Sequence, residues 1–273
     1  MVFNSQELLD QVLQVTESAV TFIRDSRKRY DKAGTSAGGV VTKGSNDFAT
    51  EVDLGAERML VEGLRPLIPE AAFITEEGTI EQAEHSIRWI VDPLDGTTNF
   101  MHGIPNYAVS VALEVEGLLE LGVVWEVSGD ECFTARRGEG AWLGDRRLQI
   151  SGQTVLSECL TATGFPYDKG KIGPYAAALA EILPRTKGLR RLGAAAVDLA
   201  YVAAGRHDAY YEKGLNPWDA AAGTLLVREA GGVVRPIKAG LDAVHDGGLI
   251  SGAPGLVDEI ASHISGIFYP QAD

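Results

Sequence analysis

The segment WIVDPLDGTTNF is the part of the 273-residue chain whose residue types and spacing most clearly allow chemistry. An apolar run leads to Asp92, a proline fixes the turn after it, and Asp95 follows three positions on. Both carboxylates can then converge on one point with the Leu94 carbonyl turned inward between them, and the backbone N–H groups of Gly96 and Thr97 can bind an anion. The spacing therefore allows a divalent cation and a phosphate in one stretch, although an Asp-Gly turn with no ligand has the same sequence.

Three more acids occupy positions that suit either a site or a simpler structural role. Glu76 follows the short apolar run FIT, Asp219 comes three residues after Asn216, and Asp53 stands three residues after Thr50. Glu76 can instead be a solvated loop charge, and the two aspartates can complete capping boxes at the starts of helices. Taken separately, these acids do not decide between the two interpretations.

Together, these motifs resemble the inositol monophosphatase family, within the wider group of lithium-sensitive, magnesium-dependent phosphatases. The resemblance runs from Lys43 to the EAGG motif that ends at Gly232. Its most specific parts are DPLDGT, which begins at Asp92, and WDAAAG, which begins at Trp218. The other matching motifs are TEVD, FITEEG, GAAAVDLAYVAAG and DAYYEKGLNPWDAAAG. On these motifs the chain is identified as a member of the family, of the bacterial type.

The resemblance implies a magnesium centre. Glu76, Asp92 and the Leu94 carbonyl would hold one Mg²⁺, Asp92, Asp95 and Asp219 would hold a second, and Glu76 would help with a weaker third. Mn²⁺ is an alternative ion, and Ca²⁺ or Li⁺ would inhibit. Hard divalent cations prefer such oxygen ligands. Two carboxylates about 5 Å apart repel by roughly 3 kcal/mol at an effective dielectric constant of about 20. The four acids should therefore admit a phosphate only when two to three ions neutralise them.

The resemblance also implies how the reaction would run. Thr97 would orient a water molecule, Asp53 would hold Thr97, and Glu76 would assist as a base through the third ion. We expect direct attack of a metal-activated water on phosphorus, with no phosphoenzyme. The Asp92-to-Asp95 spacing differs from the Asp-x-Asp spacing of phosphatases that form an aspartyl phosphate.

The substrate contacts that the resemblance implies come from distant parts of the sequence. Glu212 would accept hydrogen bonds from polyol hydroxyls, helped by the backbone from Gly193 to Ala195. Lys43 is placed near the site by the resemblance alone, and a solvated loop lysine is the alternative. The remaining expected substrate-binding positions are Asp95, Gly96 and Thr97.

Inositol-1-phosphate, hydrolysed to myo-inositol and phosphate, is the leading substrate because Thr98-Asn99-Phe100 matches the inositol class. Phe165, however, stands where the animal enzymes carry a small polar residue, which puts selectivity for inositol in question. Fructose-1,6-bisphosphate and phosphoadenosine or other nucleotide phosphates are the alternatives. From a different class, the chain could be a non-enzymatic metal or anion sensor. The presence of Thr97 and Asp53, which should orient water and not bind metal, argues against a sensor.

Composition limits the partners. The chain has 24 Lys and Arg against 38 Asp and Glu, a net charge of −14 that disfavours nucleic acid. No apolar run reaches the roughly 18 residues of a membrane helix. With no secretory signal at the start, we expect a cytoplasmic protein that does not bind membranes, and reduced Cys132 and Cys159. The resemblance implies a homodimer.

Hydrophobic periodicity predicts an α+β or α/β layered sandwich with layers in the order αβαβα. Two N-terminal helices, separated by a polar, Gly-rich stretch from Gly34 to Asn46, should cover an antiparallel sheet formed by short runs between residues 72 and 150. The later sequence alternates strands and helices, which favours a mixed sheet flanked by helices. We expect residues 1–152 and 153–273 to pack as one catalytic unit, with the main metal site in the first half and Asp219 and the substrate contacts in the second.

Overall fold

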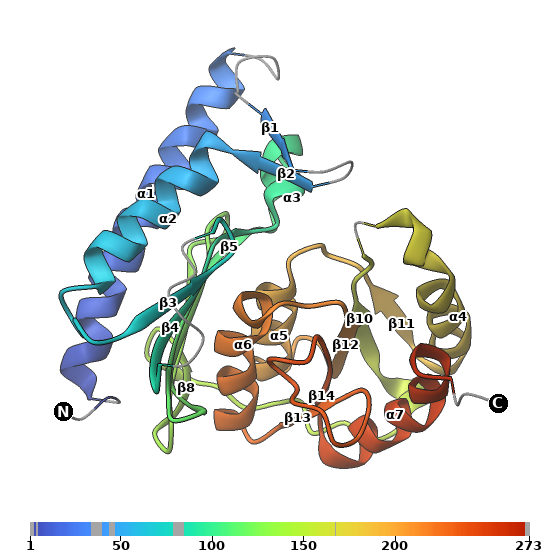
Figure 1. Cartoon of the computed structure of the whole chain (residues 1–273). Coiled ribbons are helices and arrows are strands. Elements are labelled where there is room, and N and C mark those ends of the chain that lie inside the picture. Colours follow the sequence, from blue (N-terminus) through green and yellow to red (C-terminus); the bar gives the residue numbers. More distant parts are fainter. Residues whose placement is uncertain are drawn as a thin grey trace.

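The computed structural model describes residues 3, 5–33, 40–43, 47–78, 85–166 and 168–270, with side chains except those of residues 30–50 and 169. Its helices and sheets form five layers, as the sequence predicts (Figure 1). Two helices cover one face of a seven-stranded sheet, two helices fill the space between this sheet and a five-stranded sheet, and two helices cover the outer face of the second sheet.

The seven-stranded sheet has its strands in sequence order. Neighbouring strands pair antiparallel from β4 onward, but β3 pairs parallel with β4, so the expectation of a wholly antiparallel sheet is wrong at this edge. Parallel pairing needs a connection that returns the chain to the same end of the sheet, and in the sequence this connection falls between Thr75 and Ile87. The strands are β3 (Ala72–Thr75), β4 (Ile87–Asp95), β5 (Ala108–Val115), β6 (Leu118–Glu126), β7 (Glu131–Arg136), β8 (Gly140–Leu143) and β9 (Arg146–Arg147).

Helices α1 (Gln6–Ala33) and α2 (Glu51–Leu64) pack against each other and on one face of this sheet. The apolar stripes of both helices and the alternate side chains of β4–β6 form one buried cluster, which includes Ile23, Leu60 and Trp89. Burying a large apolar side chain contributes roughly 1.5–3 kcal/mol, so this cluster fixes the sheet against the helices. One end of β4, which carries Asp92 and Asp95, is thereby held in place.

The five-stranded sheet is mixed, as expected, with the strand order β11-β10-β12-β14-β13. Strand β10 pairs parallel with β11 and β12, whereas β14 pairs antiparallel with β12 and β13. The strands are β10 (Leu160–Thr163), β11 (Gly188–Arg190), β12 (Ala209–Lys213), β13 (Val233–Pro236) and β14 (Gly248–Gly252).

Helices α5 (Ala195–Ala203) and α6 (Pro217–Glu229) lie between the two sheets and are rich in alanine. Their small side chains let the helices approach both sheets closely, and they contribute much of a second buried cluster. Helices α4 (Ile172–Ile182) and α7 (Pro254–Phe268) cover the outer face of the second sheet around a third cluster. The boundary between halves at residue 152 stays a prediction, because the middle helices pack on both sheets.

The structure differs from the sequence expectation in local details. Between α1 and α2, where the sequence predicts no strand, the chain forms a two-stranded antiparallel sheet of β1 (Val40–Lys43) and β2 (Asp47–Thr50). The last of the short runs predicted between residues 72 and 150 is shorter than its apolar pattern suggests, because strand structure there is limited to β9, which pairs with β8. Helix α3 (Thr97–His102) directly follows β4. Both cysteines are free, as expected. None of the helices among the described residues is long and apolar enough to cross a membrane.

Candidate metal and phosphate site

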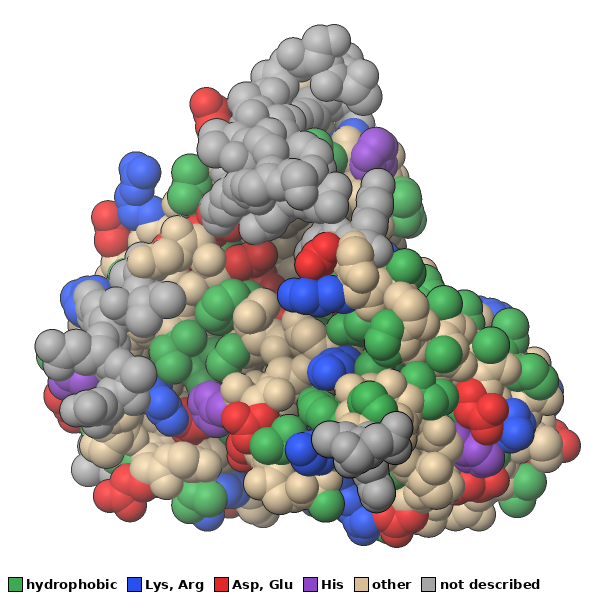
Figure 2. Space-filling view, turned by 45° about the vertical axis from the view of Figure 1, so that its right-hand side comes forward, with side chains coloured by type: hydrophobic (Ala, Val, Ile, Leu, Met, Phe, Trp, Pro, Cys, Tyr) green, Lys and Arg blue, Asp and Glu red, His purple; other side chains and the backbone are tan. Residues whose placement is uncertain are grey.

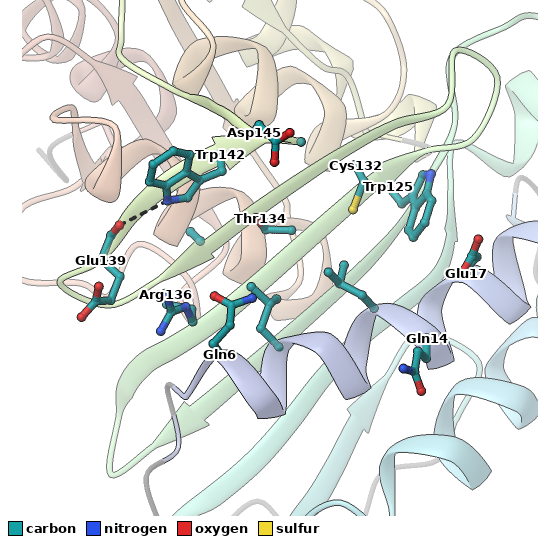
Figure 3. Close-up of a pocket in the computed structure, with 14 residues that line it drawn as sticks. Gln6, Gln14, Glu17, Trp125, Cys132, Thr134, Arg136, Glu139, Trp142 and Asp145 are labelled. Atoms are coloured by element: carbon teal, nitrogen blue, oxygen red, sulfur yellow. Dashed lines mark hydrogen bonds between the residues drawn. The ribbon is translucent and has the colours of Figure 1, made fainter.

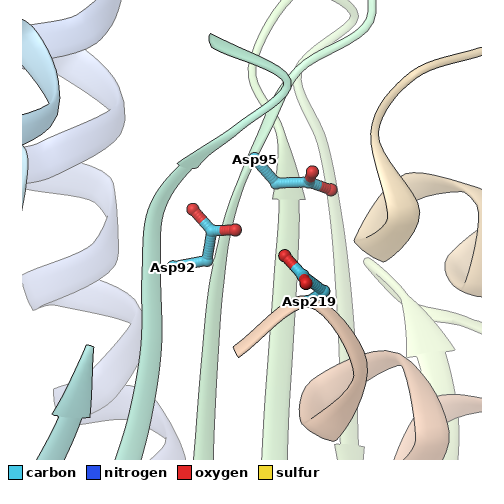
Figure 4. Close-up of side chains that lie close together, drawn as sticks. All are labelled: Asp92, Asp95 and Asp219. Atoms are coloured by element: carbon cyan, nitrogen blue, oxygen red, sulfur yellow. The ribbon is translucent and has the colours of Figure 1, made fainter. Parts of the chain in front are cut away.

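Three aspartates converge between the two sheets. Asp92 and Asp95 come from the end of β4, and Asp219 comes from the first turn of α6. One carboxylate oxygen from each lies within 4.8 Å of the others, and the side chains point toward a common centre (Figure 4). The structure therefore brings these three predicted site residues together, although Asp219 lies more than 120 positions from the other two in the chain.

An irregularity in β4 brings Asp92 and Asp95 to the same side. In a regular strand, residues three apart point to opposite faces. The pairing of β4 with β5 shifts between these residues, so Pro93 and Leu94 form an irregular step that turns the second carboxylate back toward the first. Helix α3 begins at Thr97 directly after this step, with Gly96 as its N-cap residue.

Backbone N–H groups orient the carboxylates of β4. The Leu94 N–H donates to Asp92 Oδ1 at 3.0 Å, and the Ala196 N–H in the first turn of α5 donates to Asp95 Oδ2 at 2.7 Å. Each bond engages one oxygen of its carboxylate, and each carboxylate has two oxygens that accept. The orientation of both acids is therefore set by the backbone before any ligand binds.

Asp219 has the capping role and the site position at once. The Asn216 N–H donates to Asp219 Oδ2 at 2.6 Å, and the Asn216 side chain accepts from the Asp219 backbone, which completes a capping box with Pro217 at the first helical position. The two interpretations of this acid are thus compatible: the cap fixes the rotamer with which Asp219 joins the cluster.

Glu76 reaches the cluster from the turn after β3. The turn is held by α2, where the buried Glu57 accepts a hydrogen bond from the Glu77 N–H at 2.8 Å. Burial raises the pKa of Glu76 to about 8, with a further contribution from the negative charges of Asp219 and Glu77. The sequence did not reveal Glu57, because nothing in its local pattern shows that α2 faces this turn.

The cluster is electrostatically unfavourable without a cation. Burial raises the pKa of Asp95 to about 7, assisted by the charge of Asp219, and burial raises the pKa of Asp219 to about 6. The pKa of Asp92 lies well above its usual range for the same reason, with Glu76 as the next cause. Ionised carboxylates that lie this close together and are this deeply buried need an opposite charge nearby. The donor set, which is entirely oxygen, fits a hard divalent cation such as Mg²⁺.

A half-buried hydroxyl, paired with a buried carboxylate, lies beside the cluster. The Thr97 hydroxyl lies 2.8 Å from Asp53 Oδ1 and 3.1 Å from the Leu94 carbonyl oxygen, and Asp53 is fully buried on α2. A hydroxyl has one hydrogen, so donation to Asp53 leaves the Thr97 oxygen free to accept from a water molecule. Gly96 allows this arrangement because its φ of 91° lies in the left-handed region, where other residues are strained.

The other expected substrate-binding residues line the same cleft, which has a volume of about 230 Å³. Glu212 at the end of β12 and the backbone of Gly193 and Ala195 lie on its C-terminal side. The hydroxyl of the buried Tyr210 donates to Glu212 Oε2 at 2.5 Å, and burial raises the pKa of Glu212 to about 8. The Lys43 side chain lies outside the part of the chain whose side chains are described, so its expected place near the site stays a prediction.

The cleft contains charged residues that the sequence analysis missed. Arg191 and Lys171 add positive charge to its lining, and Asp198 adds a buried acid from α5. Asp198 Oδ1 has no hydrogen-bond partner among the described residues and lies 3.5 Å from His207 Nδ1. Burial raises the pKa of Asp198 and lowers that of His207 to about 4. The signal for Asp198 was a single acid within the apolar run GAAAVDLAYVAAG.

A larger cavity of about 620 Å³ lies elsewhere, between α1 and strands β6–β8 (Figure 3). Trp125, Cys132 and Trp142 are among its lining residues. Among the described residues, the group of three or more side chains that could hold a metal ion is the aspartate cluster and not this cavity. Size therefore does not identify the site, whereas its converging acids do.

On the described part of the surface in Figure 2, acidic and basic side chains are interspersed.

Comparisons with known proteins agree with this geometry. Residues 4–267 match the model of the inositol monophosphatase family. The chain is 40% identical over 259 residues to "Nus factor SuhB" of Pasteurella multocida, covering 94% of this chain and 95% of the relative. It is 45% identical over 215 residues to the inositol-1-monophosphatase of Rhizobium meliloti, covering 78% of this chain and 81% of the relative.

Solved structures share the whole fold. The crystal structure of the extragenic suppressor protein SuhB from Bartonella henselae superposes with a TM-score of 0.87 at 38% identity, covering 95% of this chain and 98% of that chain. The inositol monophosphatase of Thermotoga maritima gives a TM-score of 0.84 at 31% identity, with 96% and 98% covered. Because the family model matches nearly the entire chain and the two solved structures cover at least 95% of it, the protein belongs to the inositol monophosphatase family, whose members are Mg²⁺-dependent and act on small phosphorylated substrates.

Proposed function

We propose that this protein is a Mg²⁺-dependent phosphomonoesterase that hydrolyses the phosphate esters of small polyols, with inositol-1-phosphate as the leading substrate. The observation that carries the proposal is the Thr97 and Asp53 pair beside the aspartate cluster. The acids alone would serve a protein that only binds a cation. A half-buried hydroxyl that is held by a buried carboxylate and lines the same cleft adds a group that can orient a nucleophile.

The acids would hold the metal in the way their geometry favours. Glu76, Asp92 and the Leu94 carbonyl would bind one ion, and Asp92, Asp95 and Asp219 a second, with Glu76 assisting at a third. When bound, the ions would supply opposite charge for the carboxylates, increase the acidity of water and neutralise charge on the phosphoryl oxygens. The backbone N–H bonds to Asp92, Asp95 and Asp219 would keep the three carboxylates in place as ligands leave and enter.

Thr97 would orient the attacking water. The Thr97 hydroxyl donates its hydrogen bond to Asp53. The Thr97 oxygen can therefore accept a hydrogen bond from the water, which turns a lone pair of the water toward phosphorus. Glu76, whose pKa of about 8 in the metal-free protein falls when a cation binds, would then take the proton. The N–H groups of Gly96 and Thr97 at the start of α3 would bind phosphate oxygens.

The leaving group would lie on the C-terminal side of the cleft. Glu212 would accept hydrogen bonds from hydroxyls of the polyol, and the backbone at Gly193 and Ala195 would add further contacts. Phe165 also lines this side, so an apolar ring faces the leaving group where the animal enzymes have a small polar residue. This substitution favours a broader choice of polyol.

Phosphate release from inositol-1-phosphate by Thr97→Ala and Thr97→Ser tests the proposal. Removing the hydroxyl should lower kcat on the order of 100-fold, the usual size of such a positioning effect, with KM little changed. The serine variant keeps the hydroxyl and should retain most of the activity. Thr154→Ala, in an exposed loop, is the matched control. Equal activity of the alanine variant and the wild type would refute the assigned role, and a wild-type protein that releases no phosphate with Mg²⁺ would refute the function.

A further inference from the structure

Gly164 and Glu212 come from two neighbouring strands of the second sheet and meet at the substrate side of the cleft. Strands β10 and β12 are parallel and in register, with Thr163 opposite Tyr211 as the last pair. The Thr163 hydroxyl donates to the Tyr211 carbonyl at 2.8 Å, which fixes this register. Gly164 and Glu212 are the next residues of the two strands, and both line the cleft.

Glu212 occupies the space that a side chain at position 164 would need. A Cβ atom on Gly164 would lie 1.8 Å from Glu212 Oε2, 2.1 Å from Cδ and 2.2 Å from Oε1. All three carboxylate atoms would be too close, so rotation of the carboxylate about its own bond would not relieve the overlap. The φ of Gly164 is not positive, so another residue could adopt this backbone. Glycine is therefore required at position 164 because it has no side chain, and not because of its backbone freedom.

The position of the Glu212 carboxylate is fixed from the other side. Tyr210 is fully buried, and its hydroxyl donates to Glu212 Oε2 at 2.5 Å. Glu212 is itself half-buried, so its carboxylate is held between the tyrosine and Gly164 while it remains accessible from the cleft. A displaced carboxylate would lose the tyrosine bond as well as its direction.

We infer that Gly164 is a specificity-determining residue. Because glycine has no side chain, it leaves a space, here called the socket, for the Glu212 carboxylate. From this position the carboxylate accepts a hydrogen bond from a hydroxyl of the leaving group. The inference rests on the proposed function. The three atoms nearest to a Cβ at position 164 all belong to Glu212, so Gly164 positions the recognition group and not the reacting atoms. It selects phosphate esters whose leaving group carries hydroxyls over esters that carry none.

The test compares two substrates in the Mg²⁺-loaded protein: inositol-1-phosphate, whose leaving group has hydroxyls, and p-nitrophenyl phosphate, whose leaving group has none. In Gly164→Ala, the ratio of kcat/KM for the two substrates should fall about 10- to 100-fold, the usual effect of losing a hydrogen bond to a charged group. Most of the fall should appear as a higher KM for inositol-1-phosphate. Gly173→Ala is the matched control, because a Cβ there meets no atom within 4 Å.

A second variant tests the contact itself. Glu212→Asp shortens the side chain by one methylene and withdraws the carboxylate from position 164. In this background, Gly164→Ala should cost little further selectivity, so the two changes should be strongly non-additive. Additive losses, or an equal loss on both substrates in Gly164→Ala alone, would overturn the inference.

The outcomes separate the inference from the function beneath it. If the wild type releases no phosphate from either ester, the proposed function fails. If the wild type is active and Gly164→Ala keeps its preference for inositol-1-phosphate, the inference alone fails. If Gly164→Ala does not fold, the double variant decides: a melting temperature equal to that of Glu212→Asp supports the socket, and an unfolded double variant contradicts it.

Discussion

The buried acids predict that Mg²⁺ stabilises this protein more at pH 8.5 than at pH 6.5. In the metal-free protein, burial raises the pKa of Glu76 to about 8 and that of Asp95 to about 7. Between the ordinary pKa of a carboxyl group and these values, the folded protein holds protons that the unfolded chain has lost. Stability therefore falls as pH rises through this window, because the rise removes protons that the folded protein still holds and that the unfolded chain has already lost.

The size of the effect follows from the two shifts. One pKa unit corresponds to about 1.4 kcal/mol, so Glu76 contributes roughly 2 kcal/mol between pH 6.5 and 8 and Asp95 somewhat under 1 kcal/mol between pH 6.5 and 7. Glu76 and Asp95 share the cluster with Asp92, whose pKa is also raised, so the three acids titrate together. The metal-free protein should lose on the order of 3 kcal/mol, which for a chain of this size is a fall in Tm on the order of 6–10 °C. Saturating Mg²⁺ keeps these carboxylates ionised in the folded state and removes the dependence.

The assay is thermal unfolding at both pH values, with saturating MgCl₂ and with EDTA. The gain in Tm from Mg²⁺ should be larger at pH 8.5 by the amount given above. Glu212, whose pKa is also raised to about 8, is not an expected metal ligand, and its contribution cancels in this double difference. His207, with a pKa of about 4, stays neutral throughout the window. A gain from Mg²⁺ that is equal at both pH values, or larger at pH 6.5, would refute the reasoning.

Three further predictions concern the same site. Asp219→Asn should reduce phosphate release at least about 100-fold and raise the Mg²⁺ concentration needed for half-maximal stabilisation, because a charged ligand is lost while an oxygen remains to cap α6; unchanged Mg²⁺ dependence would contradict its role. Li⁺ should inhibit phosphate release, since it can enter a carboxylate site without bringing equal charge, and full activity at high Li⁺ would exclude that site. In light scattering the protein should have the mass of a homodimer, and a monomer mass at assay concentration would refute this expectation.

Local sequence patterns predicted much of the fold because most elements are read from nearby residues. The apolar periodicity of α1 and α2 and the short β-rich runs placed the N-terminal layers correctly. The parallel pairing of β3 with β4 was missed, since neither strand's own sequence shows in which direction it pairs. The two strands at residues 40–50 were missed because each has only four residues and glycines flank the first of them.

The acidic site was predictable as a set of motifs but not as an arrangement. DPLDGT and WDAAAG identified Asp92, Asp95 and Asp219, yet the step in β4 that turns Asp95 toward Asp92 appears only in the pairing with β5. The support that Glu57 gives to the turn at Glu77 likewise joins positions 20 residues apart. Such contacts depend on the register and packing between elements, which cannot be derived from the local pattern of a single sequence.

The packing of Gly164 against Glu212 shows the same limit most clearly. Neither segment, GFP or YYEKG, predicts the contact, which exists because β10 and β12, 45 or more positions apart, pair in one register. A glycine with an ordinary backbone conformation gives no signal of its own. The structure supplies the reason for it, which is the volume that the carboxylate takes.

Phosphate release from inositol-1-phosphate as a function of Mg²⁺ concentration tests the central claim most directly. The wild type should release phosphate with Mg²⁺ and none with EDTA, and Asp219→Asn should show little release at any Mg²⁺ concentration that saturates the wild type. Release that is unaffected by EDTA, or no release from any phosphomonoester with Mg²⁺ present, would contradict the claim that the converging acids form a magnesium-dependent phosphatase site.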